Sequence, residues 1–230
     1  MECYFDEFHD VVCEVAGLRF ITPFPYGAFE LKGIYGDKVY GNADCDNAVV
    51  VDVGAFIGDG SLFFASRGAK RVVAFEPIPV SFDILKKNIV LNGFERAVEP
   101  RNDAIGDIFG MVKLAYIPTW PGRSSQSPSS PCENASFFSV ASIPLSYVIT
   151  TLGWVDILKL DCEGCEHRAL RDAATNGALN HVGLIIAEVH YKVRALIELL
   201  EKEGFKITNL TYSSDNWILM AKRPRRLDMT

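Results

Sequence analysis

The sequence predicts an α/β protein with a doubly wound, mostly parallel sheet covered by helices on both faces. The run at 49–51 is wholly apolar and β-branched, as is typical of a central parallel strand buried on both sides. Further apolar runs alternate along the chain with segments of helical periodicity. The last two predicted strands, 205–210 and 217–221, are joined by a loop too short for a crossover helix, so they must pair antiparallel.

The chain is organised around the turn after the first core strand. Residues 49–53 lead into glycines at 54, 58 and 60, before a helical segment at 58–67. Glycines let the backbone approach a ligand closely, and a helix N-terminus adds oriented N–H groups. The spacing is wider than the Gly-x-Gly-x-x-Gly of dinucleotide-binding proteins. It resembles the first motif of class I S-adenosylmethionine-dependent methyltransferases. The cofactor-binding candidates in this stretch are Asp52, Val53, Gly54, Ala55, Phe56 and Gly58.

A second acid follows the next strand. Residues 71–75 lead into Glu76 and Pro77, at about the distance from the glycine turn expected for a ribose-binding carboxylate. A carboxylate there can accept hydrogen bonds from both ribose hydroxyls, whereas the alternative interpretation is a solvated strand end. Pro77 opens the next helix, at 81–91, because proline is tolerated in a first helical turn. Glu76 and Pro77 therefore join the cofactor-binding candidates.

Composition excludes some function classes. The 230 residues are 49% hydrophobic, enough for the core of one domain, and the formal net charge is −6. This acidic balance disfavours nucleic acid as a partner, and we interpret the basic tail at 223–230 as a solvated end. No apolar run reaches the ~18 residues of a membrane span, and the N-terminus lacks a signal-peptide pattern. We therefore expect a soluble, cytoplasmic protein with no membrane partner.

Six cysteines are scattered along the chain, at positions 3, 13, 45, 132, 162 and 165. Cys162 and Cys165 form a Cys-x-x-Cys, but a zinc site needs a second ligand pair at related spacing, and the sequence offers none. A thioredoxin-like role would place this motif after the first strand of its fold. We expect buried or half-buried free thiols and no metal.

Residues 1–47 are interpreted as an N-terminal extension that packs on a methyltransferase domain at 48–222. Weak alternation predicts a short hairpin over 11–21. A further short strand is predicted at 29–35. Tyr35, at its end, has two interpretations: contact with the amino-acid end of the cofactor, or packing.

The third core strand, 97–101, ends at Asn102 and Asp103. In the class I methyltransferase layout this strand end lies beside the adenine. Asp103 would then accept a hydrogen bond from the adenine amino group, and Ala104 would pack on the ring. The open alternative is a turn whose residues touch no ligand.

The most loop-like stretch of the chain is 118–134, which contains a Ser/Pro run. A loop of this length in a compact domain is usually a functional lid or disordered. Trp120 and Arg123 are its candidates for substrate contact. Strands are predicted on either side, at 111–116 and 137–143.

A second informative strand, 155–160, ends at Asp161. Ligands of open α/β sheets bind beyond the carboxyl ends of the strands, so Asp161 should face the same crevice as the two earlier acids. Glu163 and Glu166 follow at a helix start. We assign Glu166 to stabilisation of the helix N-terminus, worth ~0.3–1 kcal/mol. Glu163 stays open between that role and a catalytic one.

With both stretches described, the chain resembles the FkbM family of methyltransferases. The discriminating element is Asp-x-Glu-Gly-x-Glu after the fourth strand, in place of the Asn/Asp-Pro-Pro-Tyr/Phe of amino-methylating enzymes. The resemblance implies a class I, Rossmann-like seven-stranded sheet with an antiparallel C-terminal hairpin. The matching pieces, between about residues 49 and 190, are Asp52-Val-Gly-Ala-Phe-Ile-Gly58, Ala74-Phe-Glu-Pro77, Asn88 with Asn92-Gly93, Ala104-Ile-Gly-Asp107 and Ile157-Leu-Lys-Leu-Asp-Cys-Glu-Gly-Cys-Glu166.

The resemblance also implies methyl transfer from S-adenosylmethionine to a hydroxyl of a sugar, polyketide or other small molecule. The donor is already activated, so alignment of the acceptor does much of the work, but the hydroxyl must lose its proton to a base. Asp161 and His190, both at strand ends, are the candidate bases, with Glu163 as a third catalytic candidate. An unperturbed His titrates near pH 6.5, which suits the task, although a lone His at a strand end is often structural.

Three alternatives stay open. A catalytically silent protein would bind S-adenosylmethionine without turnover. An RNA methyltransferase would use the basic tail for salt-dependent binding that truncation of 222–230 abolishes. A metal-assisted O-methyltransferase would use Asp161, Glu163 and His190 as ligands, an idea that activity surviving EDTA would dismiss. The acceptor and the oligomeric state are not predicted by the sequence.

Overall fold

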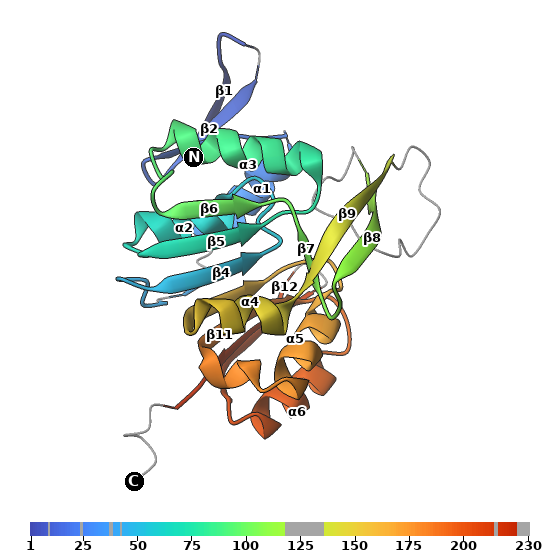
Figure 1. The fold of residues 1–230 in the computed structure, drawn as a ribbon. Helices are drawn as coiled ribbons and strands as arrows, with labels where there is room; N and C mark the ends of the chain where they lie inside the picture. Colours follow the sequence, from blue (N-terminus) through green and yellow to red (C-terminus); the bar gives the residue numbers. More distant parts are fainter. Residues whose placement is uncertain are drawn as a thin grey trace.

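The central feature of the structure is a mostly parallel sheet with a layer of helices on each face (Figure 1). This computed structural model describes residues 1–8, 10–23, 25–36, 39–41, 43–117, 136–213 and 216–224. The predictions for Trp120, Arg123, Cys132 and residues 225–230 of the basic tail fall outside these residues. Within them the sheet has seven strands in the order β12-β13-β11-β10-β4-β5-β6. Their bounds are β4 Val49–Val53, β5 Arg71–Phe75, β6 Val98–Arg101, β10 Val155–Leu160, β11 Val182–Val189, β12 Lys206–Ser213 and β13 Asn216–Lys222.

Strand directions confirm the predicted fold class. β6, β5, β4, β10 and β11 run parallel to one another, whereas β13 pairs antiparallel with both β11 and β12. The central position of β4 follows from its sequence, because Val50 and Val51 point to opposite faces and both are fully buried. The short loop between the last two strands gives the antiparallel hairpin, as expected.

Helices cover the two faces in two groups. α1 (Tyr26–Tyr35), α2 (Asp59–Ser66) and α3 (Pro79–Leu91) share a hydrophobic cluster with Val50. α4 (Leu145–Leu152), α5 (Glu166–Thr175), the 3₁₀ turn η1 (Ala178–His181) and α6 (Val193–Lys202) share another cluster with Val51. One helix layer therefore comes from the chain before residue 92, and the other from the chain after residue 144.

The N-terminal segment corrects one prediction. The hairpin is confirmed as β2 (Val11–Val15) and β3 (Leu18–Ile21), with β1 (Glu2–Phe5) added at its edge. The strand predicted at 29–35 is wrong, because these residues belong to α1. Leu31 and Ile34 are buried at helical spacing whereas Phe29 is 69% exposed, so the apolar run follows a helical period and not a strand period.

A third sheet lies at the carboxyl end of β6, because only Asn102 and Asp103 separate β6 from β7 (Ala104–Gly106). β9 (Ser136–Pro144) pairs parallel with β7 and antiparallel with β8 (Gly110–Tyr116). The strands predicted at 111–116 and 137–143 are thereby confirmed, with slightly wider bounds. β7 was not predicted as a strand, because its short sequence looks like the continuation of a turn.

The cysteines contradict the expectation of free thiols. Cys3 and Cys13 lie opposite each other on β1 and β2 and form a disulfide, and Cys162 and Cys165 form a second one before α5. Among the described residues Cys45 is the one free cysteine, and it is buried. Pairing of Cys3 with Cys13 depends on the register of two strands, which the spacing in sequence does not reveal.

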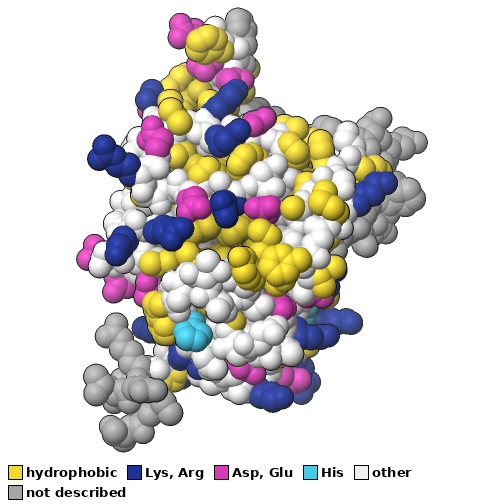
Figure 2. Space-filling model, viewed as in Figure 1, with side chains coloured by type: hydrophobic (Ala, Val, Ile, Leu, Met, Phe, Trp, Pro, Cys, Tyr) yellow, Lys and Arg dark blue, Asp and Glu magenta, His cyan; other side chains and the backbone are white. Residues whose placement is uncertain are grey.

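The surface mixes charges of both signs. On the face seen in Figure 2, basic side chains of the described residues alternate with acidic ones, and apolar side chains gather between them. Among the residues that the structure describes, no helix has both the length and the apolar character needed to cross a membrane.

Candidate active site

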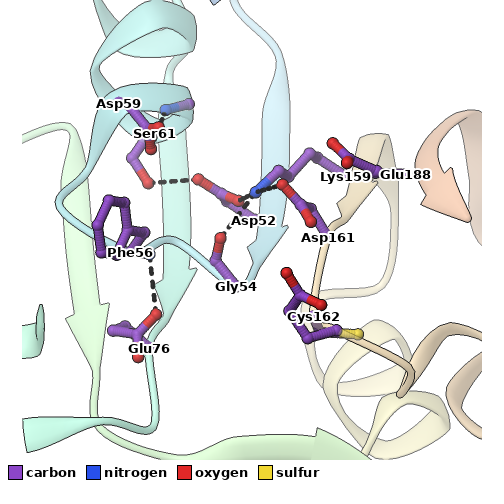
Figure 3. A network of polar contacts seen from close by, with 12 residues as sticks. Asp52, Gly54, Phe56, Asp59, Ser61, Glu76, Lys159, Asp161, Cys162 and Glu188 are labelled. Atoms are coloured by element: carbon purple, nitrogen blue, oxygen red, sulfur yellow. Dashed lines mark hydrogen bonds and ion pairs between the residues drawn. The ribbon is translucent and has the colours of Figure 1, made fainter. Parts of the chain in front are cut away.

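The candidate site lies where the central strands end. Gly54, Glu76, Asp161 and His190 follow β4, β5, β10 and β11 respectively, and the carboxyl ends of these parallel strands lie at one edge of the sheet. Figure 3 shows Gly54, Glu76 and Asp161 at this edge. This edge is where open α/β sheets bind their ligands. The structure therefore brings the strand-end acids to one place, as the sequence indicated.

The glycine turn is in direct contact with the loop after β10. Gly54 has φ +79°, and a Cβ there would overlap the backbone carbonyl oxygen of Asp161. Gly58 has φ +91°, and a Cβ there would lie 2.7 Å from Leu85 Cδ1. Both positions therefore require glycine. Val53 and Ala55, also predicted to bind cofactor, have their side chains in the core, so only their backbones can contact a ligand.

Asp52 is fully buried, with no surface for a ligand. Its carboxylate accepts a hydrogen bond from Ser61 Oγ at 2.6 Å and lies 3.0 Å from Lys159 Nζ. Buried charges persist in proteins when they are paired in this way. Asp52 therefore shapes the turn from beneath, and does not contact the cofactor directly.

Glu76 is 6% exposed, so it is not a solvated strand end. Its Oε2 accepts the backbone N–H of Phe56 at 2.9 Å and its Oε1 accepts that of Ile78 at 2.8 Å. Burial raises the pKa of Glu76 to about 7, although these two hydrogen bonds oppose the shift. Each oxygen keeps acceptor capacity for a ribose hydroxyl. Asn102, predicted as a turn residue, donates to the carbonyls of Glu76 and Pro77 and so fixes the turn.

Three further cofactor candidates lie at the rim. Asp103 is half-buried after β6, and Ala104 packs in a small cluster with Ile78. The hydroxyl of Tyr35 donates to the backbone carbonyl of Asp59, and its ring packs against Phe63. The geometry of Tyr35 thus favours the packing interpretation.

The loop between β10 and α5 is held by Glu166, which is fully buried. Glu166 Oε1 accepts the backbone N–H groups of Cys162 and Gly164, both at 3.2 Å. The loop contains Glu163 at φ +53° and is closed by the Cys162–Cys165 disulfide. Glu166 therefore organises the whole turn and does more than stabilise a helix end.

His190 is held between two carboxylates. Its Nδ1 lies 3.0 Å from Glu166 Oε1, and its Nε2 lies 3.3 Å from Glu163 Oε2. Burial lowers the pKa of His190, but the hydrogen bonds and charges of the two carboxylates outweigh burial and raise it to about 11. The ring is therefore protonated at neutral pH and cannot accept a proton, which argues against His190 as the base. Glu163 is occupied by the same ion pair.

Asp161 is the strand-end acid that faces the crevice. Its side chain is 31% exposed, and its Oδ2 lies 3.8 Å from Lys159 Nζ. Burial and the neighbouring Glu188 raise the pKa of Asp161 well above its ordinary value, whereas Lys159 and His190 act in the opposite direction. A small pocket of about 50 Å³ adjoins it, lined by side chains that include Glu30, Tyr40, Lys159, Asp161, Glu188 and Ile218.

Potential metal-binding atoms of Asp161, Glu188 and His190 lie within 4.8 Å of one another. Glu188 thus replaces Glu163 in the ligand set that the sequence suggested. His190, however, keeps both ring nitrogens beside carboxylates and carries a proton. A cation would have to displace that proton, so we do not assign a metal to this cluster.

Comparison with known families decides the assignment. Residues 52–207 match the model of the methyltransferase FkbM domain, which spans more than half of the chain. The chain belongs to the FkbM methyltransferase family. This confirms the predicted family and, with it, S-adenosylmethionine as the cofactor.

Individual relatives agree with this family. Methyltransferase sdnD of Sordaria araneosa is 34% identical over 102 residues, a match that spans 44% of this chain and 39% of that protein. Methyltransferase FkbM from Methylobacillus flagellatus KT superposes with a TM-score of 0.56 at 16% identity, covering 87% of this chain and 50% of that one. Magnesium protoporphyrin IX methyltransferase of Synechocystis PCC 6803, with bound S-adenosylmethionine, superposes with a TM-score of 0.51 at 13% identity, covering 86% of this chain and 80% of that one. The two structures show a shared fold.

The FkbM-family site contains residues that sequence analysis missed. Lys159, the next-to-last residue of β10, is 3% exposed. Asn88 donates to the carbonyls of Ile21 and Ile57, which ties β3 to the glycine turn. A signal for Lys159 was present, because a charged residue within an apolar strand needs a buried partner. The partners of Asn88 lie 67 and 31 residues away, and the sequence offers no signal for them.

The ion pairs of His190 should make the stability of this FkbM-family protein depend on pH. The pKa of His190 is about 11 in the folded state, against 6.5 for an ordinary histidine. The stabilisation is therefore complete below about pH 6.5 and is lost as pH rises towards 11. We expect His190→Gln to lower the melting temperature at pH 6 and to weaken the decline between pH 7 and pH 10, measured by thermal unfolding. Exposed His181→Gln is the control, and equal pH profiles of His190→Gln and wild type would contradict the ion pairs.

Proposed function

We propose that this FkbM-family chain transfers a methyl group from S-adenosylmethionine to a hydroxyl of a small-molecule acceptor. The observation that carries the proposal is the position of Asp161, an acid with a raised pKa directly beside the Gly54 turn. Methylation of a hydroxyl requires a proton acceptor next to the transferred methyl, and a carboxylate whose pKa is raised is a stronger base than an ordinary aspartate. The raised pKa of His190 and its ion pair with Glu163 favour Asp161 as the base among the three candidates.

The cofactor would be held by the turn after β4 and by the acid after β5. The turn lies against the loop after β10 because Gly54 has no Cβ, and the backbone of Gly54, Ala55 and Phe56 would border the cofactor there. The Glu76 carboxylate is aimed by two backbone N–H groups and would accept the ribose hydroxyls. Asp103 and Ala104, beyond β6, would border the adenine, as in the class I layout.

The chemistry is an in-line displacement. The acceptor oxygen forms a bond to the methyl carbon while the carbon–sulfur bond breaks, and the electron pair of that bond goes to sulfur. The sulfonium becomes the thioether of S-adenosylhomocysteine, and the hydroxyl proton passes to the Asp161 carboxylate. The protein's contribution is to align the acceptor and to supply the base.

The small pocket beside Asp161 bears on the acceptor. α1 provides one wall through Glu30, and the ends of β10 and β11 provide another. A pocket of about 50 Å³ beside the proposed base has room for the reacting group of an acceptor. We therefore propose a small-molecule acceptor whose reacting hydroxyl enters from the side of α1, with residues 1–47 acting as an extension that completes this wall.

Calorimetric titration with S-adenosylmethionine and with NAD⁺ is the first test. We expect binding of S-adenosylmethionine alone. Radiolabelled S-adenosylmethionine is then incubated with a panel of hydroxylated sugars and polyketides and, separately, with amines and RNA. Label in hydroxyl compounds is the expected result. Binding without transfer to any acceptor would favour a silent binding protein, and label in amines or RNA would replace the proposed acceptor class.

A further inference from the structure

Lys159 is the buried charge that the proposed chemistry does not yet use. Its side chain is 4% exposed, and its ammonium group lies among acceptors from three parts of the site (Figure 3). Nζ donates to the carbonyl oxygen of Gly54 at 2.7 Å and lies 3.0 Å from Asp52 Oδ1 and 3.8 Å from Asp161 Oδ2. A single side chain thus contacts the glycine turn and reaches the strand-end acid.

These two contacts join the parts whose relative position decides methyl transfer. The Gly54 carbonyl belongs to the turn that holds the cofactor, and Asp161 belongs to the loop that supplies the base. The two segments already touch, since a Cβ on Gly54 would overlap the Asp161 carbonyl oxygen. An in-line displacement tolerates little misplacement, because reacting atoms must approach to about 3–3.5 Å in line.

We propose that Lys159 is a positioning residue, which holds the cofactor turn and the Asp161 carboxylate in one arrangement and keeps that carboxylate ionised. The proposal rests on the proposed role of Asp161 as the base. Its first part is geometric, through the Gly54 carbonyl. Its second part is electrostatic, through the short distance to Asp161 Oδ2.

The charges around this pair explain why a cation is needed. Acids outnumber cations there, and Lys159 opposes the rise in the pKa of Asp161, so loss of Lys159 would raise that pKa further and favour the protonated carboxyl. Burial disfavours a charged Lys159, but Asp52 and the other acids raise its pKa well above the ordinary value, so it stays charged. The titratable groups that act on Lys159 or Asp161 from the surrounding elements are Glu30, Tyr40, Asp52, Asp59, Glu188 and His190. Glu163 faces His190 and not this pair.

The competing explanation is that Lys159 serves only as the counter-ion of Asp52. Lys159→Met alone does not separate the two, because it leaves a buried, unpaired Asp52, which destabilises the fold. Two variants separate the explanations. The first carries Asp52→Asn alone, and the second combines Asp52→Asn with Lys159→Met. The second variant removes both buried charges, and Asp52→Asn with Lys159→Gln is the substitute if it does not fold.

The test measures the titration midpoint of the Asp161 carboxyl directly by ¹³C NMR. The signal of Asp161 is identified by its absence in Asp161→Asn. We expect the Asp161 midpoint to rise by about one pH unit or more when Lys159→Met is added to Asp52→Asn. The acidic limb of the kcat/KM profile should move by the same amount, which lowers the rate about tenfold per unit below the new midpoint. Equal Asp161 midpoints in the two variants would overturn the proposal.

The control is Lys70→Met. Lys70 is exposed at the amino end of β5, opposite the carboxyl ends that form the site. Its replacement should change neither the Asp161 midpoint nor the pH profile of kcat/KM. The NMR result does not depend on turnover, so the two proposals can fail separately. A raised midpoint in a protein that methylates no hydroxyl would keep the effect of Lys159 on Asp161 and overturn the proposed function. If the protein methylates hydroxyls but the Asp161 midpoint does not move, the proposed function stands and the role of Lys159 is overturned.

Discussion

Replacing Asp161 with Asn should lower kcat for methyl transfer about 10²–10⁴-fold, the usual contribution of a general base. Asparagine matches aspartate in shape but cannot take the proton of the acceptor hydroxyl. The affinity for S-adenosylmethionine should change little, because Asp161 touches the glycine turn through its backbone and that contact is retained. Single-turnover transfer of labelled methyl, with calorimetric titration of the cofactor, separates the two effects.

The same strand provides the control for this substitution. Asp156 lies at the other end of β10, where its Oδ2 accepts the backbone N–H of Val49 at 2.8 Å. Asp156→Asn should therefore affect stability slightly and leave turnover unchanged. Full turnover in Asp161→Asn would remove Asp161 from the mechanism, and loss of turnover in His190→Gln at unchanged stability would return His190 to it.

The sheet could be predicted because burial on two faces leaves a clear pattern. The β-branched run of β4 and the acids after β5 and β10 identify strand ends without further information. α1 was mistaken for a strand because a short apolar run fits either period, and only the burial of Leu31 and Ile34 beside exposed Phe29 decides between them.

The roles within the site were less predictable than its position. An ordinary histidine pKa makes His190 a suitable base. In the structure, Glu163 and Glu166 lie beside its two ring nitrogens and raise its pKa to about 11. Those neighbours come from 24 and 27 residues earlier in the chain, and contact between them depends on the pairing of β10 with β11. Sequence motifs give the type and order of such groups, whereas charge states depend on distances that only the fold provides.

Glu76 should also make the unliganded protein less stable as pH rises from about 4.5 to about 7. Its folded-state pKa is about 7 against an ordinary value of 4.5, so the folded state keeps a proton that the unfolded state has lost in this range. Thermal unfolding without cofactor should show a decline there that Glu76→Gln reduces. An identical decline in that variant would assign the effect to other groups.

Replacing Glu76 with Gln should weaken S-adenosylmethionine binding by about 10²-fold or more. The carboxylate would accept two charge-assisted hydrogen bonds from the ribose, each worth about 1.5–3 kcal/mol, and 1.4 kcal/mol is tenfold in affinity. The amide retains a single acceptor oxygen, and its NH₂ group would face the N–H of either Phe56 or Ile78. Calorimetry measures the loss, and Glu99→Gln, at a half-buried glutamate on β6, is the matched control.

The pH dependence of this binding distinguishes the carboxylate from a purely steric role. Burial places the pKa of Glu76 at about 7, and the ionised form is the one that accepts both ribose hydroxyls. The dissociation constant of wild type should therefore be level above pH 7 and rise by up to about tenfold per unit below it, with a proton released on binding. In Glu76→Gln the profile should be flat. A wild-type affinity that does not change between pH 5.5 and pH 8.5 would mean that the ribose is bound elsewhere, because a group that titrates in this range cannot hold a ligand through its charge without leaving that signature.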